Sequence, residues 1–293
     1  MDPDSNAWWQ RIAVNPLFFV LAVAYVTTGH AMTMIIAFIA VTGHELTHAI
    51  VAEAYGLTVT RIEIWPFGGM ADIPGLDAQE PYIETMVAVA GPLQNLLLAG
   101  LAWWGARWLP FDPRWVHDFI EANLFIGGLN LLPVAPLDGG HLAKTYWAQH
   151  VGYQKAEERT VQWGIWLSFG LVALTVLSFL TGHPALNMGL FAAFLYWGAW
   201  KSGHQSPYLI IRDLELRPQY FAKRPVWLIE DFAVRFDAPV SDVLKIMRPL
   251  KYHRLLVLDA DLKRLGTLLE EELLAAIEHG GPQTLVGDLL VTR

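Results

Sequence analysis

The chain has 293 residues, of which 54% are hydrophobic and only 16% are charged, and its net charge is −8. This apolar content is typical of an integral membrane protein with room for one soluble appendage. An acidic chain rich in tryptophan is not expected to bind nucleic acid. Because there is no cysteine, disulfides and thiolate ligands are excluded, so any metal must be held by nitrogen and oxygen.

The charges divide the chain near residue 201. Residues 1–200 hold 7 Lys and Arg against 15 Asp and Glu, whereas residues 201–293 hold 13 of each. We therefore expect a membrane part at 1–202, a linker at 203–222 and a soluble domain at 223–293. The N-terminus lacks the basic region and the cleavage site of a signal peptide, so the first apolar segment is expected to remain in the mature protein.

Six apolar segments predict about six transmembrane helices. The first is short and needs residues from Trp8 onward to reach the 20 or so that cross a bilayer. The third is expected to be interrupted at Gly91-Pro92, since proline removes a backbone donor and kinks a helix. Six crossings put both termini on one side, and the distribution of Lys and Arg places that side in the cytoplasm. The segments are 16–28, 31–55, 82–109, 116–133, 162–181 and 185–201.

The second segment carries the sequence His44-Glu45-Leu46-Thr47-His48. In a helix, this spacing puts both imidazoles on one face, one turn apart, where they can share a tetrahedral Zn²⁺ with Glu45 beside it as general base. Ionisable residues cost about 2.5 to 3.5 kcal/mol each at the centre of a membrane helix, so they need a function such as metal binding. His30, at the turn before this segment, is a further candidate ligand, although a lone histidine at a turn is more often simply polar.

Residues 57–73 alternate in hydrophobicity with a period of two, which predicts a pair of strands with a bend at Pro66-Phe67-Gly68-Gly69. Sheet edges are not tolerated against lipid, so the pair is expected to line a cavity in the protein. An edge strand beside a metal site can hold an extended peptide by strand addition. An ordinary hairpin at the membrane interface is the alternative, and both interpretations stay open.

Residues 130–141 form the second informative stretch. Pro133 and Pro136 rule out a continuous helix, and Asp138 is the only acid in its apolar part. Asp138 can provide the third protein ligand that a catalytic zinc site usually has. Alternatively, it caps a helix that restarts near Gly140.

Beyond the linker, the tail predicts a small α+β domain. Its expected elements are a helix at 240–247, a hairpin of strands 254–258 and 264–269 around Asp259-Ala260-Asp261, and a helix at 270–279.

These motifs, together with Gly91-Pro92-Leu93-Gln94-Asn95, resemble the site-2 protease family of intramembrane zinc metalloproteases. The tail resembles a single CBS domain, and this pairing is most similar to the stage IV sporulation proteases of bacteria. The resemblance implies a polytopic α-helical membrane protein that cleaves a membrane-associated precursor, such as that of a sporulation sigma factor. It also implies inhibitory membrane partners and a homo-oligomer. It assigns one Zn²⁺ to His44, His48 and Asp138, the acid/base role to Glu45, and a polar role near the metal to Asn130.

The resemblance also implies ATP at the CBS-like tail, but the sequence departs from the usual pattern there. Leu269 stands where nucleotide-binding CBS domains commonly have Thr or Ser, and Glu272 where they have Asp. A rival from another class is a metal transporter or channel with a regulatory tail. It explains His44, His48 and Asp138, but it gives Glu45 no role, and the six segments show no inverted repeat.

Overall fold

The structure is a computed structural model that describes residues 12–65, 68–76, 79–108, 111–182, 185–223, 226, 228–248, 251–281 and 283–291. The chain forms two compact units. Unit 1 comprises Met1–Ala143 and Gln162–Ala199, and unit 2 comprises Lys144–Val161 and Trp200–Arg293. Three helices have residues in both units.

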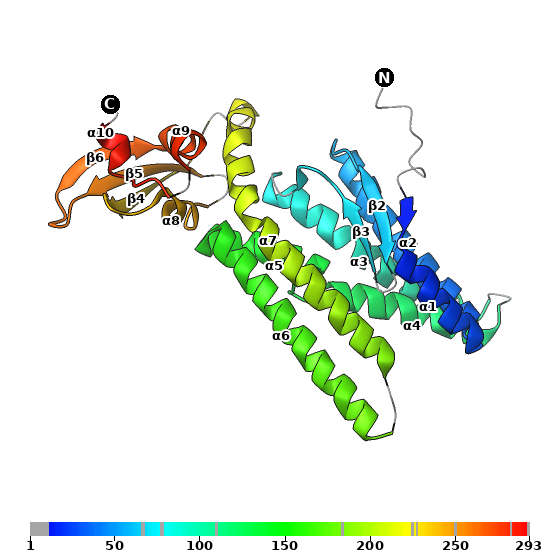
Figure 1. The fold of residues 1–293 in the computed structure, drawn as a ribbon. Coiled ribbons are helices and arrows are strands. Elements are labelled where there is room, and N and C mark those ends of the chain that lie inside the picture. The colour runs from blue at the N-terminus through cyan, green and yellow to red at the C-terminus, as the bar shows by residue number, and fades with distance from the viewer. Residues whose placement is uncertain are drawn as a thin grey trace. The chain divides into compact units, whose positions relative to one another are not determined.

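Helices α1 to α4 match the first four predicted apolar segments to within four residues at each end (Figure 1). Helix α6 begins nine residues before its predicted segment, α7 continues 22 residues beyond its own, and α5 corresponds to no predicted segment. Of the helices in the described part of the chain, α2, α3 and α6 are long and apolar enough to cross a membrane. These three helices are fewer than the six transmembrane helices predicted from the sequence, so the number six stays a prediction. The helices are α1 (Pro16–Thr27), α2 (Ala31–Ala54), α3 (Pro81–Gly105), α4 (Pro113–Asn130), α5 (Asp138–Val151), α6 (Tyr153–Leu180) and α7 (Leu186–Lys223).

The first predicted span is too long at its N-terminal end. Ile12–Val14 form strand β1 rather than helix, and Trp8 lies outside the described residues. Helix α1 therefore has 12 residues and rises about 18 Å, less than the hydrocarbon core of about 30 Å. Ile12–Val14 pair instead with Ile62–Ile64, about fifty residues later in the chain. Local hydropathy cannot reveal a pairing between such distant segments.

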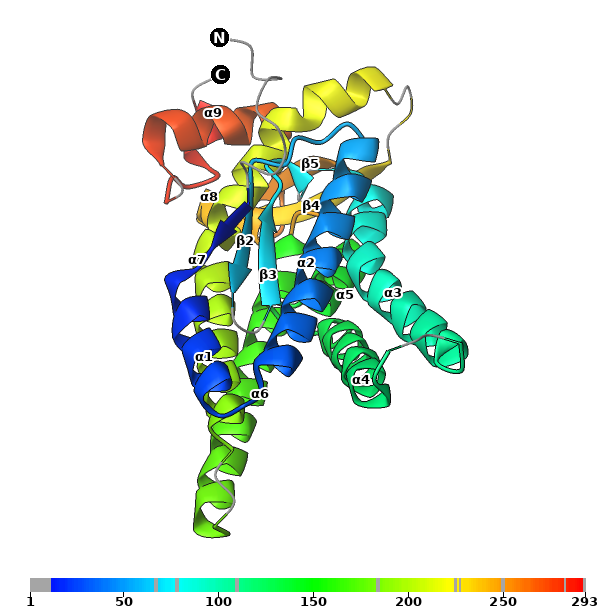
Figure 2. The same ribbon diagram turned by 90° about the vertical axis from the view of Figure 1, so that its right-hand side faces the viewer.

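The predicted strand pair is confirmed as β2 (Arg61–Trp65) and β3 (Gly68–Asp72), while Pro66 and Phe67 of the expected bend lie outside the described residues. The strand order is β1-β2-β3. Strand β1 is parallel to β2, and β3 is antiparallel to it. Strand β3 is therefore an outer strand, and Figure 2 shows the sheet beside α2.

Helix α2 packs against α1, α3, α4 and the sheet. Its buried positions recur every three or four residues, as one face of a helix requires. This face contains the predicted metal-binding motif. Its buried residues are Ile36, Ala40, Val41, His44, Glu45, His48, Ala49 and Ala52.

Helix α3 runs without interruption through Pro92, so the interruption expected at Gly91-Pro92 is wrong. Gly91 and Pro92 are buried, together with Asn95 one turn later. Neighbouring helices can support a proline inside a membrane helix by supplying the contacts that local sequence lacks.

Residues 131–137 separate α4 from α5, as the two prolines predict. The two glycines that follow Asp138 are needed for close backbone packing. A side chain at Gly139 would overlap the carbonyl oxygens of Leu131 and Leu132, and one at Gly140 would lie 2.5 Å from that of Val134. This packing fixes the start of α5, and with it Asp138.

Unit 2 contains a second sheet with the order β4-β5-β6 (Figure 1). The predicted hairpin and the helix at 270–279 are confirmed, whereas the helix expected at 240–247 ends at Leu244, and strand β4 was not predicted. Residues 203–222, expected as a linker, lie within α7. The elements are β4 (Ile229–Arg235), α8 (Val240–Leu244), β5 (Tyr252–Leu258), β6 (Arg264–Leu269), α9 (Glu270–Gly280) and α10 (Asp288–Val291).

Candidate metal centre

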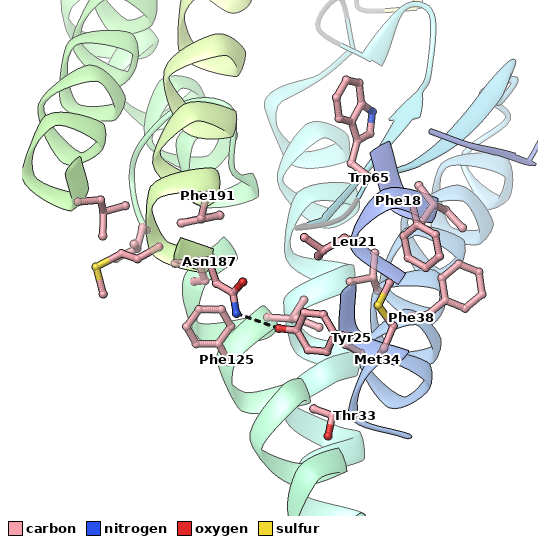
Figure 3. Close-up of a pocket in the computed structure, with 18 of the residues that line it drawn as sticks. Phe18, Leu21, Tyr25, Thr33, Met34, Phe38, Trp65, Phe125, Asn187 and Phe191 are labelled. Atoms are coloured by element: carbon pink, nitrogen blue, oxygen red, sulfur yellow. Dashed lines mark hydrogen bonds between the residues drawn. The ribbon is translucent and has the colours of Figure 1, made fainter. Parts of the chain in front are cut away.

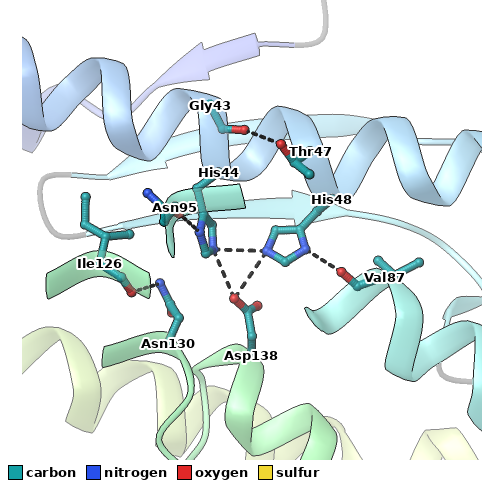
Figure 4. A network of polar contacts seen from close by, with 9 residues as sticks. All are labelled: Gly43, His44, Thr47, His48, Val87, Asn95, Ile126, Asn130 and Asp138. Carbon is teal, nitrogen blue, oxygen red and sulfur yellow. Dashed lines mark hydrogen bonds and ion pairs between the residues drawn. The ribbon is translucent and has the colours of Figure 1, made fainter. Parts of the chain in front are cut away.

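Three side chains from two distant helices meet in unit 1 (Figure 4). Nε2 of His44 lies 3.0 Å from Oδ2 of Asp138 and 3.0 Å from Nε2 of His48. Nε2 of His48 lies 3.2 Å from the same oxygen. Both histidines are buried, and the Asp138 side chain is 20% exposed. The structure thus brings together the three residues predicted as metal ligands.

The spacing of these three atoms fits a zinc ion. With bonds of about 2.0 to 2.1 Å, ligand atoms of a tetrahedral zinc site lie about 3.3 Å apart. The observed separations of 3.0 to 3.2 Å are close to this edge length. Two imidazoles and a carboxylate are also a donor set that catalytic zinc sites use.

The hydrogen bonds of the other ring nitrogens fix which nitrogen faces the site. Nδ1 of His48 lies 2.7 Å from the carbonyl oxygen of Val87, which only accepts hydrogen bonds, so Nδ1 carries the proton. Nδ1 of His44 likewise donates to Oδ1 of Asn95 at 2.5 Å. When each ring is neutral, its Nε2 holds a lone pair that can bind a metal ion. Two lone pairs and a carboxylate that converge at about 3 Å repel one another unless a cation lies between them.

The orientation of Asn95 is itself set by a chain of hydrogen bonds. Its Nδ2 donates to Oδ1 of Asn123 at 2.8 Å, and Nδ2 of Asn123 donates to the carbonyl oxygen of Phe119 at 2.8 Å. Both asparagines are fully buried. Because the chain ends on a backbone acceptor, Asn95 must present its oxygen to His44. Such outer hydrogen bonds orient metal-binding histidines.

Glu45, next to His44 on α2, is buried with 6% of its surface exposed. Its carboxyl group receives a hydrogen bond from the backbone of Gly69 in β3. The predicted general base therefore lies between the metal-binding face of α2 and the sheet.

Gly91 leaves room for the two imidazoles. A Cβ atom at this position would overlap Nε2 of His48 and would lie 2.6 Å from Cε1 of His48 and 2.8 Å from Cε1 of His44. Any side chain at residue 91 would occupy the space of the rings.

Asn130 and His30, the other candidates from the sequence, form their hydrogen bonds outside the group of His44, His48 and Asp138. Asn130 is the last residue of α4, and its Nδ2 donates to the carbonyl oxygen of Ile126 at 3.1 Å, a bond within its own helix. His30 precedes α2 and is exposed, about 21 Å along the helix axis from His44. Asp138 begins α5 and directs its carboxylate to the histidines. Sequence reasoning noted Asn95 without giving it a role and missed Asn123, because the bonds that join Asn95 to His44 and to Asn123 connect segments far apart in sequence.

We expect Gly91→Ala to lose zinc, because the added methyl group displaces the imidazoles. Gly100→Ala in the same helix is the matched control, since a Cβ atom there meets nothing within 4 Å. Metal analysis of the two purified proteins tests this expectation. Equal, stoichiometric zinc in both variants would contradict it.

Asn95→Ala should weaken zinc binding by about 10-fold to 100-fold, the range found when outer hydrogen-bond partners of metal ligands are removed. The variant leaves Nδ1 of His44 without its acceptor, whereas Gln94→Ala removes the neighbouring amide and serves as control. Competition with a chelator of known affinity measures the change. An unchanged affinity in Asn95→Ala would show that the asparagine chain does not support the site.

Several known proteins are similar to this chain. The profile of Peptidase family M50 matches residues 32–112. Stage IV sporulation protein FB of Bacillus subtilis is 32% identical over 154 residues, which are 52% of this chain and 54% of that protein. MJ0611 of Methanocaldococcus jannaschii, named as a zinc metalloprotease, is 30% identical over 164 residues, which are 46% of this chain and 84% of that protein.

A solved structure shows the same fold. The site-2 protease from Methanocaldococcus jannaschii matches with a TM-score of 0.56 and 24% identity, over 66% of this chain and 90% of that chain. The chain spans about half the length of several curated relatives that it matches. Site-2 proteases are integral membrane proteins, in agreement with the apolar helices α2, α3 and α6. The chain therefore belongs to peptidase family M50, the site-2 protease family.

Proposed function

We propose that this protein is an intramembrane zinc metalloprotease that hydrolyses a peptide bond in a membrane-associated protein. The observation that carries the proposal is the convergence of Nε2 of His44, Nε2 of His48 and Oδ2 of Asp138. Membership of a peptidase family supports it.

In this proposal, His44, His48 and Asp138 hold one Zn²⁺ and Glu45 transfers protons. Zinc in such a site polarises a carbonyl group and lowers the pKa of water toward about 7. The carboxylate of Glu45 accepts a proton from the attacking water and returns it to the leaving amine. Burial of Glu45 keeps bulk water away from this transfer. Asn130 is assigned to the developing oxyanion or to the substrate, as its place before the Asp138 segment suggests.

An apolar cavity of about 610 Å³ provides a route for the substrate (Figure 3). It lies among α1, α2, α4, α6, α7 and the end of β2. Val41, three residues before His44, and Trp65, at the end of β2, both line it, so the cavity reaches toward the metal centre. One polar bond crosses it, from Nδ2 of Asn187 to the hydroxyl oxygen of Tyr25 at 3.0 Å. An apolar wall suits a hydrophobic segment of a substrate.

The outer strand β3 offers a place for the unwound part of the substrate. Peptide hydrolysis needs an extended backbone, because a helix hides its carbonyl groups in hydrogen bonds. An extended peptide can add to a free strand edge through backbone hydrogen bonds. We assign this pairing to the outer strand β3, which contacts Glu45 through Gly69.

A sporulation sigma-factor precursor is the substrate that we propose, with inhibitory membrane proteins as regulators. The supporting observation is the likeness to stage IV sporulation protein FB. In a cell, this requires the soluble tail to lie in the cytoplasm, and we propose six crossings with both termini on that side.

The tail is proposed as a CBS-like regulatory domain. Its order of strands and helices, β4-α8-β5-β6-α9, and its own apolar core support a separate folding unit. Leu269 and Glu272 argue against ATP as its ligand, and a second copy of the tail is a candidate partner in a homo-oligomer. A metal transporter is not favoured, because the family match is to peptidases.

Glu45→Gln should keep zinc and lose proteolysis, because an amide cannot accept the proton of water and Glu45 is not one of the three converging ligands. Asp138→Ala should lose zinc as well as activity, since two imidazoles alone leave the metal underligated. Co-expression with a candidate membrane-associated precursor and metal analysis of the purified proteins test both variants.

Two results would contradict these roles. Cleavage by Glu45→Gln would overturn the protease proposal. Zinc bound with unchanged affinity by Asp138→Ala would return Asp138 to the role of a helix cap.

Removing residues from Lys223 onward should leave zinc binding intact, because every proposed ligand precedes residue 140. Cleavage of a precursor with a soluble domain should fall about tenfold or more, since a tethering domain raises the effective substrate concentration. The truncation also removes Met247, whose carbonyl oxygen accepts from the backbone of Tyr153 at 3.5 Å. Zinc content therefore serves as the control for folding. Undiminished cleavage would show that the tail does not hold the substrate.

A further inference from the structure

We propose that Gly69 in β3 is a positioning residue for the general base Glu45. The inference rests on the proposed protease function and adds a role for the sheet: besides lining the site, it fixes where the proton acceptor lies. Two features of Gly69 carry the inference, namely its missing side chain and its backbone hydrogen bond.

Glu45 occupies the space that a side chain at Gly69 would need. A Cβ atom at Gly69 would overlap Cγ of Glu45 and would lie 2.5 Å from its Cδ and 2.7 Å from its Oε1. The adjacent Gly68 in the same strand is different, because a Cβ atom there meets nothing within 4 Å. Of these two neighbouring glycines, only Gly69 is thus required by the catalytic side chain.

The second feature is a hydrogen bond from the backbone of Gly69 to the Glu45 carboxyl group. Gly69 is paired with Ile64 on one side of β3, and among the described residues no strand pairs with the other side, since β3 ends the sheet. The carboxyl group of Glu45 on α2 therefore binds a backbone group of an outer strand. Glycine in a strand weakens the strand and often marks a site of close approach, and here the approaching group is the carboxylate.

This contact matters because the glutamate side chain has three rotatable bonds and must hold its carboxylate in one place. A misplacement of about 1 Å in a reacting group can cost about 100-fold in rate. Helix α2 fixes only the backbone of Glu45. Gly69 holds the far end of the side chain, independently of the hydrogen bonds that orient His44 and His48.

The test compares Gly69→Ala with Gly68→Ala in the full-length protein, using a membrane-associated precursor as substrate. The methyl group at residue 69 should push Glu45 aside while the three metal ligands stay in place. We expect stoichiometric zinc, an unchanged KM, and a kcat lowered by about 100-fold. Gly68→Ala should keep the zinc, KM and kcat of the wild type.

A double variant separates positioning from a general effect on the strand. Glu45→Asp shortens the side chain and withdraws it from Gly69, so it should lower kcat by itself. Adding Gly69→Ala to Glu45→Asp should then change kcat by less than about twofold, because residues that act through one another are not additive. A purely structural role of Gly69 would lower kcat in both backgrounds by the same factor.

The outcomes are distinct. Equal kcat for Gly69→Ala and Gly68→Ala, additive losses in the double variant, or loss of zinc in Gly69→Ala would each overturn the positioning role. A zinc-loaded wild type that does not cleave, or a Glu45→Gln variant that does, would overturn the proposed protease function and this inference with it.

Discussion

The meeting of two imidazole lone pairs and one carboxylate, each about 3 Å from the next, is the constraint on which unit 1 depends. In a buried site, such an arrangement is unfavourable without a cation. It also requires the backbones of α2 and α5, which are about ninety residues apart in sequence, to stay fixed relative to each other. The glycines at 139 and 140, which pack against carbonyl groups, and the break after α4 provide this fixation.

Small and amide side chains let the helices approach one another around this centre. Gly91 faces the histidines, and a Cβ atom at Gly127 would lie 3.1 Å from Cβ of Asn95. Close helix packing in membranes relies on small residues and on polar side chains that bond across the interface. Here the same contacts also orient a ligand, because Asn95 joins α3 to both His44 on α2 and Asn123 on α4. Packing and metal binding are therefore one network.

The sequence predicted the parts of this network that depend on local pattern. Each of these signals lies within a few residues of sequence. They are the spacing of His44 and His48, the period of two in β2 and β3, and the isolated acid Asp138. The sequence could not predict strand β1, the uninterrupted α3 or the role of Asn123, because each depends on a partner from a distant segment. The first predicted span erred for the same reason, because Ile12–Val14 pair with β2 as strand β1 rather than joining the helix.

The glycines show this limit most clearly, since sequence marks a missing side chain but not what fills its space. At Gly91 the space holds imidazole rings, and at Gly69 it holds the carboxylate arm of Glu45. The metal ligands are thus supported from α3, through Gly91, Val87 and Asn95, whereas the base is supported from β3. Two separate elements support two separate chemical tasks. Metal binding and proton transfer can therefore be disturbed one at a time, although His44 and Glu45 are adjacent in the chain.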